Sequence, residues 1–372
     1  MKRFFASLLT VVFSVCCIHT VCRAEPGTGE CYILTEAGTG EVIAEKNADS
    51  EQSIYGLTKL MSLLVIYDAI GEGALKADME TAVSQEAAKK TGVRAFLDGG
   101  AVYTVEELLL PAVMCGANDA ITALAETVSG SEEAFVDAMN EKADKIGISA
   151  SFADCTGLSP ENKATPRGLA QICAALSQYA GIFKLSSIGT ETFVHKSGRE
   201  TELANANRLI RESGYDGLMT SSNGTADYAV AAAYKSGGAR YICIVTGAAD
   251  SASRFETARR LVGEADATYS VKRIAKAGSL VKTIEAEDVS EGEIQIYAKE
   301  DLSVLYKKGE DIKKTIEIGE IILPLAAGDK VGEISVEGKG SVDLIVKQDY
   351  EISTFLSAAS KVIRDRLGLL SI

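Results

Sequence analysis

The chain has 372 residues, of which 47% are hydrophobic and 24% are charged, and it contains five prolines. This composition is typical of a globular protein, and the length predicts two folded domains with further segments at the ends. The 38 basic residues are outnumbered by 52 acidic ones, which gives a formal net charge of −14. Because such a chain repels a phosphate backbone, we expect no nucleic-acid partner.

Residues 1–24 predict a cleaved signal peptide. Lys2 and Arg3 precede an apolar run at 4–21, and Ala24 supplies a small residue at the expected cleavage site. No stop-transfer pattern follows the run, so a membrane-spanning helix is not expected here. The mature protein is therefore expected to begin near Glu25 and to be secreted.

Five cysteines lie outside this leader, at positions 31, 115, 155, 173 and 243. They are scattered, and His195 is the only histidine in the mature sequence, so a metal site is not expected. The favoured interpretation is that they are buried small hydrophobic residues, with one disulfide bridge among them left open.

Residues 25–267 show the pattern of a mixed α/β domain. The predicted elements, in chain order, are a hairpin at 31–45, a helix that begins near 57 and ends at 71 or 73, a helix at 104–110 with a capping box at 104–107, an alanine-rich helix at 118–128, a hairpin at 230–245 and a closing helix at 254–262. Strands at both ends with helices between them imply the mixed fold.

After position 267 the pattern changes to short stretches of alternating hydrophobicity. Such stretches at 293–297, 302–306, 315–318 and 342–346 predict a small all-β domain at 268–350. Residues 351–372 follow with apolar side chains at helical spacing and Lys361 and Arg364 on the opposite face, which predicts an amphipathic helix. Packing on its own domain and association with a membrane surface are both compatible with this helix.

Several short motifs occur in an order that resembles one known family. They are 41–48 (EVIAEKNA), 57–61 (LTKLM), 103–109 (YTVEELL), 117–120 (ANDA), 165–170 (TPRGLA), 207–209 (NRL), 215–218 (YDGL) and 323–334 (LPLAAGDKVGEI). Together they resemble the secreted D-alanyl-D-alanine carboxypeptidases, the low-molecular-mass penicillin-binding proteins. The resemblance implies a penicillin-binding/β-lactamase-like transpeptidase domain with α/β (α+β) fold, an all-β domain after it, and a tail that anchors the protein at the outer face of the cytoplasmic membrane. It implies no cofactor and a peptidoglycan stem peptide as substrate.

The first motif of that family, Ser-x-x-Lys at a helix start, supplies the nucleophile and the amine that activates it. Here the matching residues are 56–59, and Lys59 is kept while Gly56 replaces the serine. Thr58 lies about 200° further round the helix, and Ser53 lies before the helix, so neither replaces the missing hydroxyl. We therefore expect no oxygen or sulfur nucleophile beside the ammonium group of Lys59.

The second motif, Ser-x-Asn, relays protons and positions the substrate. It matches residues 116–118, where Asn118 is retained and Gly116 has lost the hydroxyl. Cys115 is adjacent and is a conceivable thiol nucleophile, but a buried hydrophobic role is the favoured interpretation.

The third motif, Lys-Thr-Gly on an edge strand, receives the terminal carboxylate of the substrate. It matches Met219, Thr220 and Ser221. The lysine is lost, and with it a charged hydrogen bond worth roughly 1.5–3 kcal/mol. The side chain of Ser221 also crowds a strand that the family's glycine leaves open to the substrate backbone. Binding of the stem peptide is therefore expected to be weakened.

Two other tripeptides match the motifs only as letters. Residues 90–92 read Lys-Thr-Gly and residues 221–223 read Ser-Ser-Asn. Both lie in the wrong order along the chain, so we interpret them as chance matches.

The leading hypothesis is therefore a carboxypeptidase homologue that is catalytically inactive because the nucleophile position is Gly56. It would act as a binding or scaffold protein close to peptidoglycan. The main alternative is an active serine-type D-Ala-D-Ala carboxypeptidase that uses an unorthodox nucleophile, Ser53 or Cys115. A third possibility is a structural wall protein in which the all-β domain carries the interaction.

Overall fold

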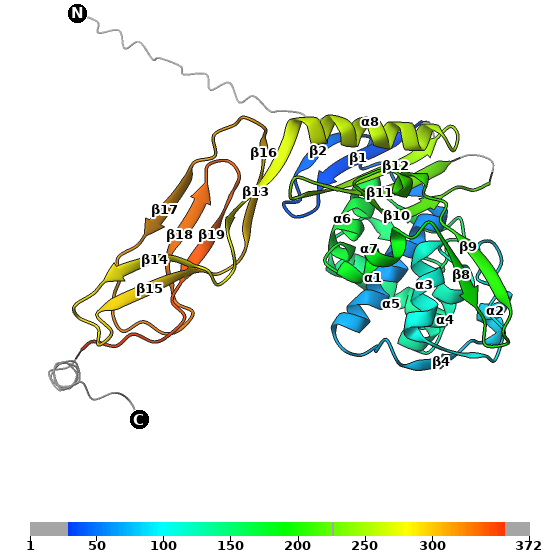
Figure 1. Cartoon of the computed structure of the whole chain (residues 1–372), viewed down its shortest axis with the longest axis horizontal. Coiled ribbons are helices and arrows are strands. Elements are labelled where there is room, and N and C mark those ends of the chain that lie inside the picture. Colours follow the sequence, from blue (N-terminus) through cyan, green and yellow to red (C-terminus); the bar gives the residue numbers. More distant parts are fainter. Residues whose placement is uncertain (1–28, 225–226, 354–372) are drawn as a thin grey trace, which may run out of the picture.

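The structure is a computed structural model that describes residues 29–224 and 227–353. The predicted signal peptide and all but the first three residues of the predicted amphipathic tail lie outside these ranges. The described chain forms a mixed α/β domain followed by an all-β domain, as the sequence predicts (Figure 1). Helix α8 ends at Thr268 and strand β13 begins at Tyr269, so the two domains follow each other directly.

The α/β domain is organised around a five-stranded antiparallel sheet with the order β10-β11-β12-β1-β2. Its strands are β1 (Cys31–Glu36), β2 (Val42–Lys46), β10 (Tyr215–Ser221), β11 (Tyr228–Ser236) and β12 (Ala239–Ala248). Both predicted hairpins are confirmed, since β1 pairs with β2 and β11 pairs with β12. Strand β10 lies at one edge of the sheet, where one side of its backbone is left without a partner strand among the described residues.

Both faces of this sheet are covered. In β11, Val230 and Ala232 pack in the hydrophobic cluster under α8, whereas Ala231 and Ala233 pack against the helices of the opposite face. Figure 1 shows α8 above the sheet and the other helices below it. Burial on both faces explains why β11 and β12 read as continuous apolar runs instead of alternating ones.

Most of the helices lie on that second face. The helical elements are η1 (Tyr55–Thr58), α1 (Lys59–Gly71), α2 (Gln85–Lys89), α3 (Val105–Met114), α4 (Asn118–Ser129), α5 (Glu132–Lys145), α6 (Pro166–Leu176), α7 (Ala180–Ser186), η2 (Arg208–Arg211) and α8 (Ser253–Thr268). The four helices predicted from the sequence are all present, and a short 3₁₀ turn precedes α1.

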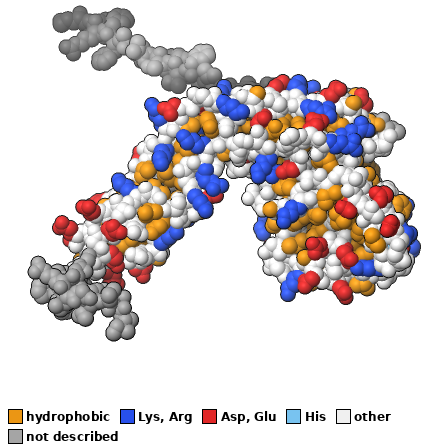
Figure 2. Space-filling model, viewed as in Figure 1, with side chains coloured by type: hydrophobic (Ala, Val, Ile, Leu, Met, Phe, Trp, Pro, Cys, Tyr) orange, Lys and Arg blue, Asp and Glu red, His pale blue; other side chains and the backbone are white. Residues whose placement is uncertain are grey.

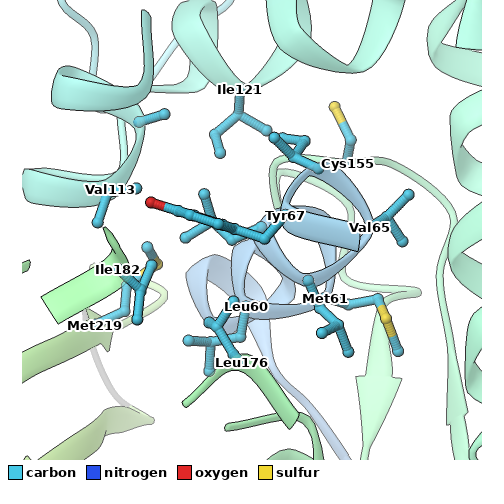
Figure 3. Close-up of a cluster of buried hydrophobic side chains, with 14 of the residues drawn as sticks. Leu60, Met61, Val65, Tyr67, Val113, Ile121, Cys155, Leu176, Ile182 and Met219 are labelled. Carbon is cyan, nitrogen blue, oxygen red and sulfur yellow. The ribbon is translucent and has the colours of Figure 1, made fainter. Parts of the chain in front are cut away.

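Helix α1 is buried on almost every side. Ten of its 13 residues are buried, because α4, α5 and α6 all contact it. A helix that is apolar all round is typical of a domain interior. Leu60, Met61 and Tyr67 from α1 converge with Ile121 and Met219 in one core cluster (Figure 3). The charged group at the start of α1 therefore lies next to a large apolar core.

Helix α3 begins with the predicted capping box. The hydroxyl of Thr104 accepts a hydrogen bond from the backbone N–H of Glu107, and the Glu107 carboxylate accepts one from the Thr104 N–H. The predicted end at position 110 is wrong, because the helix continues through Pro111 to Met114. A proline removes one backbone hydrogen bond, but the buried side chains after it keep the last turn helical.

Replacing Thr104 with alanine is expected to lower the free energy of unfolding by about 1 kcal/mol, because the first turn of α3 loses its cap. The matched control is Thr104→Ser, which keeps the hydroxyl and should unfold close to the wild-type midpoint. Chemical denaturation followed by circular dichroism measures both variants. Equal losses for alanine and serine would show that the methyl group, and not the cap, stabilises this turn.

Short strands complete the α/β domain around its helices. They pair as β3 (Gln52–Ser53) with β7 (Lys163–Ala164), β6 (Ala150–Ser151) with β7, β4 (Glu80–Ala82) with β5 (Val102–Thr104), and β8 (Thr190–Val194) with β9 (Glu200–Ala204). The pairing of β3 with β7 ties the segment before α1 to a loop more than a hundred residues later in the chain.

The all-β domain has a core of its own. Its strands are β13 (Tyr269–Ala275), β14 (Leu280–Glu285), β15 (Glu293–Ala298), β16 (Leu302–Lys307), β17 (Lys314–Ile318), β18 (Lys330–Val336) and β19 (Gly340–Ile345). Five of them form a sheet with the order β14-β15-β19-β18-β17, and β13 pairs with β16. A separate hydrophobic cluster, which includes Ile296, Val304 and Leu344, fills the space between them.

The described residues also bear on cysteine pairing and on the surface. All five cysteines outside the leader are free, so the disulfide left open from the sequence is not formed.

Within 29–224 and 227–353, no helix is both long enough and apolar enough to cross a bilayer. On the face shown in Figure 2, basic and acidic side chains are interspersed over both domains.

Candidate functional site

The three altered motifs come together at the start of α1, although they are far apart in the sequence. A Cβ atom at Gly56 would lie 3.3 Å from the Oγ of Ser221 and 3.6 Å from the Nζ of Lys59. A Cβ atom at Gly116 would lie 3.4 Å from the Cδ of Lys59 and 3.6 Å from the Sδ of Met219. The residues predicted from the first, second and third motifs thus surround the side chain of Lys59.

Lys59 is a buried cation. Burial lowers its pKa to about 8, and the opposing attraction of the Asp154 carboxylate is too weak to restore the ordinary value. Among residues 29–224 and 227–353, its ammonium group makes no hydrogen bond to another side chain. An amine with this pKa is partly neutral near pH 8 and can then accept a proton.

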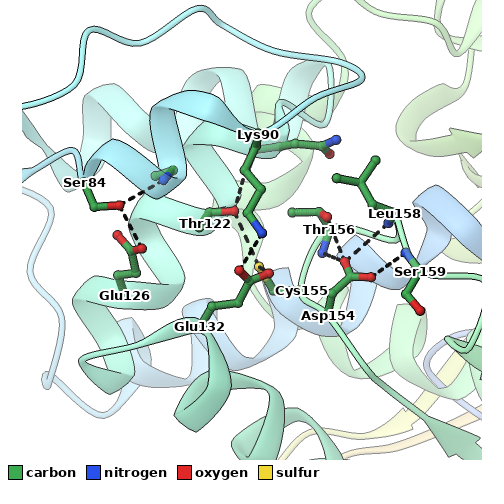
Figure 4. A network of polar contacts seen from close by, with 12 residues as sticks. Ser84, Lys90, Thr122, Glu126, Glu132, Asp154, Cys155, Thr156, Leu158 and Ser159 are labelled. Atoms are coloured by element: carbon green, nitrogen blue, oxygen red, sulfur yellow. Dashed lines mark hydrogen bonds and ion pairs between the residues drawn. The ribbon is translucent and has the colours of Figure 1, made fainter.

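The turn just before Gly56 is held in an unusual conformation. Tyr55 has a φ angle of 43°, and a Cβ atom at Gly157 would lie only 1.9 Å from the Tyr55 carbonyl oxygen, so a glycine is required there. The loop around Gly157 is organised by Asp154, whose carboxylate accepts hydrogen bonds from the backbone N–H groups of Thr156 and Ser159 (Figure 4). Burial tends to raise the pKa of Asp154, but these hydrogen bonds outweigh it and lower the pKa.

Asn118 is the retained residue of the second motif, and it is buried at the start of α4. Its Nδ2 donates a hydrogen bond to the Thr91 carbonyl at 2.7 Å, while its Oδ1 has no partner among the described residues. The tripeptide at 90–92 therefore lies beside the site. The sequence match alone did not predict this position. Lys90 is ion-paired with Glu132 at 2.5 Å, so it does not replace the missing lysine of the third motif (Figure 4).

A cavity of about 630 Å³ lies next to this tripeptide. It is lined by polar and charged groups from α2, α4 and α5, together with one exposed leucine: Ser84, Glu86, Lys89, Lys90, Thr91, Glu126, Gly130, Ser131, Glu132 and Leu158. Two of its carboxylates already have partners, since Ser84 donates to Glu126 and Lys90 pairs with Glu132. No sequence signal indicates this cavity, because its lining comes from separate segments.

Met219 is the residue matched from the sequence to the lysine of the third motif. Its side chain is buried and belongs to the same core cluster as Ile182 (Figure 3). Thr220, the next residue of β10, is half-buried. An apolar thioether offers no charge to a carboxylate, and its burial makes Met219 part of the hydrophobic core.

Ser221 lies close to Gly56, since its Oγ would be 3.3 Å from a Cβ atom at that position. It donates a hydrogen bond to the Ile54 carbonyl at 3.2 Å. Arg254 holds the end of the strand by donating to the carbonyls of Ser221 and Ala229 at 2.8 and 3.1 Å.

The two alternative nucleophiles considered from the sequence are engaged elsewhere. The Ser53 hydroxyl donates to the Pro160 carbonyl at 2.8 Å. The Cys115 thiol donates to the Pro111 carbonyl at 3.2 Å, and burial raises its pKa to about 11. A thiol with such a pKa is almost entirely protonated at neutral pH, and a protonated thiol is a poor nucleophile.

Two family models match this chain, one for each of its two domains. A family model described as D-alanyl-D-alanine carboxypeptidase matches residues 22–250, and one described as penicillin-binding protein 5, C-terminal domain, matches residues 269–353. The chain therefore belongs to the D-alanyl-D-alanine carboxypeptidase family.

Individual relatives extend over most of the chain. The D-alanyl-D-alanine carboxypeptidase DacF of Bacillus subtilis is 30% identical over 344 residues, which cover 90% of this chain and 88% of DacF. DacC of Escherichia coli is 28% identical, with 87% of this chain and 84% of DacC covered. The crystal structure of penicillin-binding protein 5 from Haemophilus influenzae has a TM-score of 0.74 at 24% identity, covering 86% of this chain and 97% of the other. That structural likeness shows a common fold.

Proposed function

We propose that this protein is a cell-envelope member of the carboxypeptidase family that no longer hydrolyses stem peptides and acts as a binding or scaffold protein close to peptidoglycan. The observation that carries the proposal is Gly56, which leaves no side-chain atom to acylate at the position of the family's nucleophilic serine. Loss of a nucleophilic serine lowers the rate of an acyl-transfer hydrolase by about 10⁶.

Two further changes support the proposal. Gly116 lacks the hydroxyl that the family's second motif supplies, and Met219 places an apolar side chain where a cation would receive the substrate carboxylate. The first change removes a proton relay and the second weakens binding. An intact scaffold around three altered motifs fits a protein that keeps the fold for a role other than turnover.

The proposed location is outside the cytoplasm, at the outer face of the cell membrane. It rests on the signal-peptide pattern at 1–24 and on the amphipathic pattern at 351–372. The acidic net charge of the whole chain means that attraction to anionic lipids would have to come from the local basic residues of the tail.

The decisive experiment measures release of D-alanine from a synthetic stem pentapeptide by the purified protein. We expect no release above the uncatalysed rate, with Bacillus subtilis DacF as the positive control. Turnover that disappears in Ser53→Ala or in Cys115→Ala would overturn the proposal and identify the nucleophile.

Binding is tested separately by sedimentation with purified peptidoglycan. We expect the full chain to sediment with the wall polymer. The region 268–350 has its own hydrophobic core, so it can be tested alone. Complete binding by this region would assign the interaction to the all-β domain, whereas no binding by the full chain would exclude the scaffold role.

A further inference from the structure

We propose that the β8–β9 hairpin is a pH-sensitive latch, which holds the segment 91–98 beside Asn118 while His195 is neutral and releases it when His195 is protonated. The latch consists of β8, β9 and the turn 195–199 between them, and it lies next to α3 (Figure 1). The inference goes beyond the proposed function, because it concerns the mobility of a segment that borders the site. It holds whether or not the protein turns over a substrate.

The segment 91–98 lies between α2 and β5 and is bonded directly to the site. The backbone N–H of Asn118 donates to the Val93 carbonyl at 2.7 Å. The Nδ2 of the same residue donates to the Thr91 carbonyl, also at 2.7 Å. Any loosening of this segment therefore changes the support of Asn118, the retained residue of the second motif.

The middle of the segment has a backbone conformation that its surroundings must hold. Phe96 has a φ angle of 61°, in the left-handed region, and 49% of its surface is exposed, so burial of its ring does not fix it. On one side, the Asp119 carboxylate accepts hydrogen bonds from the N–H groups of Ala95 and Leu97, both at 3.0 Å. On the other side, Arg199 of the latch donates to the Phe96 carbonyl.

Arg199 joins the latch to the segment. Besides the Phe96 carbonyl, its Nη2 reaches the Oδ1 of Asp98 at 3.0 Å, and the Ser197 hydroxyl donates to the Oδ2 of Asp98 at 3.0 Å. The side chains of Arg199 and Asp98 are 42% and 41% exposed, and an ion pair in water contributes little by itself. The connection therefore depends on what orients the guanidinium.

His195 orients it. The Nδ1 of His195 is 3.2 Å from the Arg199 Nη2 and 3.3 Å from the Tyr103 hydroxyl, while its Nε2 is 2.8 Å from the Thr201 hydroxyl. A guanidinium donates hydrogen bonds and accepts none, so Nδ1 is the acceptor and the ring proton is on Nε2. The neutral imidazole thus fits this site in one tautomer.

A second proton would be added to Nδ1, where it has no room. Its N–H would point at an N–H of Arg199, and two positive groups would face each other at 3.2 Å. The Tyr103 hydroxyl can turn to accept the new hydrogen bond, but the guanidinium cannot. Protonation of His195 therefore expels Arg199, and with it the bonds to Phe96 and Asp98.

The charges around His195 give the direction of the pH dependence. Burial and the Arg199 guanidinium lower the pKa of His195, and the carboxylates of Asp98 and Asp119 oppose them without restoring the ordinary value of 6.5. The docked latch thus binds fewer protons at this residue than the released one. Docking weakens as the pH falls below about 6.5.

The ion pairs at the same contact keep their charges in this range. Hydrogen bonds from Arg199 and Ser197 hold the pKa of Asp98 below its usual range. Burial tends to raise the pKa of Glu107, but its bonds with Lys196 and Thr104 outweigh burial and lower the pKa. Histidine is the side chain whose ordinary pKa lies between pH 5 and 8.

The test is hydrogen exchange followed by mass spectrometry on the full mature chain at about pH 7.5 and about pH 5. Rates are expressed relative to the intrinsic rate at each pH. We expect protection in peptides from 91–98 and 190–204 to fall about tenfold or more at the lower pH, because hydrogen bonds from a charged group are lost. Protection in α8 and in the all-β domain should stay the same. Equal protection of 91–98 at both pH values, or a uniform loss along the chain, overturns the proposal.

Titration of His195 links the loss of protection to this residue. It is the only histidine after position 24, so its imidazole signal in a proton NMR spectrum needs no assignment by mutation. We expect its midpoint to lie below about 6.5 and to coincide with the loss of protection at 91–98. A midpoint above 6.5, or one that does not coincide with the change in exchange, contradicts the latch.

Two variants separate the roles of the latch residues. His195→Asn keeps an uncharged acceptor close to the Nδ1 position and has no proton to gain, so it should remove the pH dependence of protection at 91–98. Arg199→Met should lower that protection about tenfold or more at both pH values, whereas the matched control Arg211→Met, at another exposed arginine, should behave like the wild type. An unchanged pH dependence in His195→Asn, or unchanged protection in Arg199→Met, with folding verified by circular dichroism, overturns the assignment.

Discussion

Replacing Lys59 with methionine is expected to raise the free energy of unfolding by about 3 kcal/mol at pH 7, since a pKa difference of 1 between the folded and unfolded states corresponds to about 1.4 kcal/mol. Burial lowers the pKa of this lysine from 10.5 to about 8, so the folded state disfavours the charged form. Methionine is similar in length and apolar, and it would extend the core cluster that already contains Leu60 and Met219.

The gain should depend on pH in a defined window. Between about pH 8 and 10.5 the unfolded chain binds more protons at this residue than the folded one, so wild-type stability rises with pH. Below pH 8 the full free-energy cost of burying the charged Lys59 amine is present, and above pH 10.5 this cost is absent. The Asp154 carboxylate acts to raise the pKa of the amine, but burial lowers it by more.

Urea denaturation of wild type and Lys59→Met at pH 7 and pH 10 measures this difference. The matched control is Lys76→Met, which changes an exposed lysine and should alter stability by less than about 0.5 kcal/mol. A Lys59 variant that is less stable than wild type at pH 7 would show that the ammonium group is well solvated or paired, which contradicts its burial.

Lys59 illustrates how far the sequence could be read. Its place at the start of a helix followed from the spacing of Leu57, Leu60 and Leu64, and α1 has that position in the structure. The hairpins, the capping box at Thr104 and the change to an all-β domain could also be predicted from the sequence, because hydrophobic periodicity and turn residues are local signals. Motif order was enough to recognise the family.

Contacts between segments that are distant in the sequence could not be predicted from it. Ser221 and Gly56 lie close together although they are more than 160 positions apart in the sequence. Strand β10, which carries Ser221, pairs with β11 and packs against η1, which contains Gly56. The same holds for Asn118 and Thr91, whose bond depends on how a loop returns to α4. From the sequence, Ser221 was an obstacle to substrate, and the structure adds that its hydroxyl donates to the Ile54 carbonyl, close to Gly56.

The restoration of the family's groups is the second large effect that we expect. The combined variant Gly56→Ser, Gly116→Ser, Met219→Lys and Ser221→Gly should react with penicillin about 10²- to 10⁴-fold faster than the wild type, because a serine next to Lys59 regains a general base. The adduct should be located on the serine at position 56. Labelling with fluorescent penicillin gives the rate, and peptide mapping gives the location.

The four changes should not contribute equally. Gly56→Ser alone is expected to give less than the double exchange with Ser221→Gly, since its Cβ would lie 3.3 Å from the Ser221 Oγ and that hydroxyl would have to shift slightly. Gly116 has a φ angle of +69°, where a side chain costs about 1–2 kcal/mol, and the triple variant without Gly116→Ser should therefore be the more stable form. If the double variant Gly56→Ser, Ser221→Gly stays unreactive while its fold and melting temperature match the wild type, the position of Lys59 is no longer suited to activate a serine.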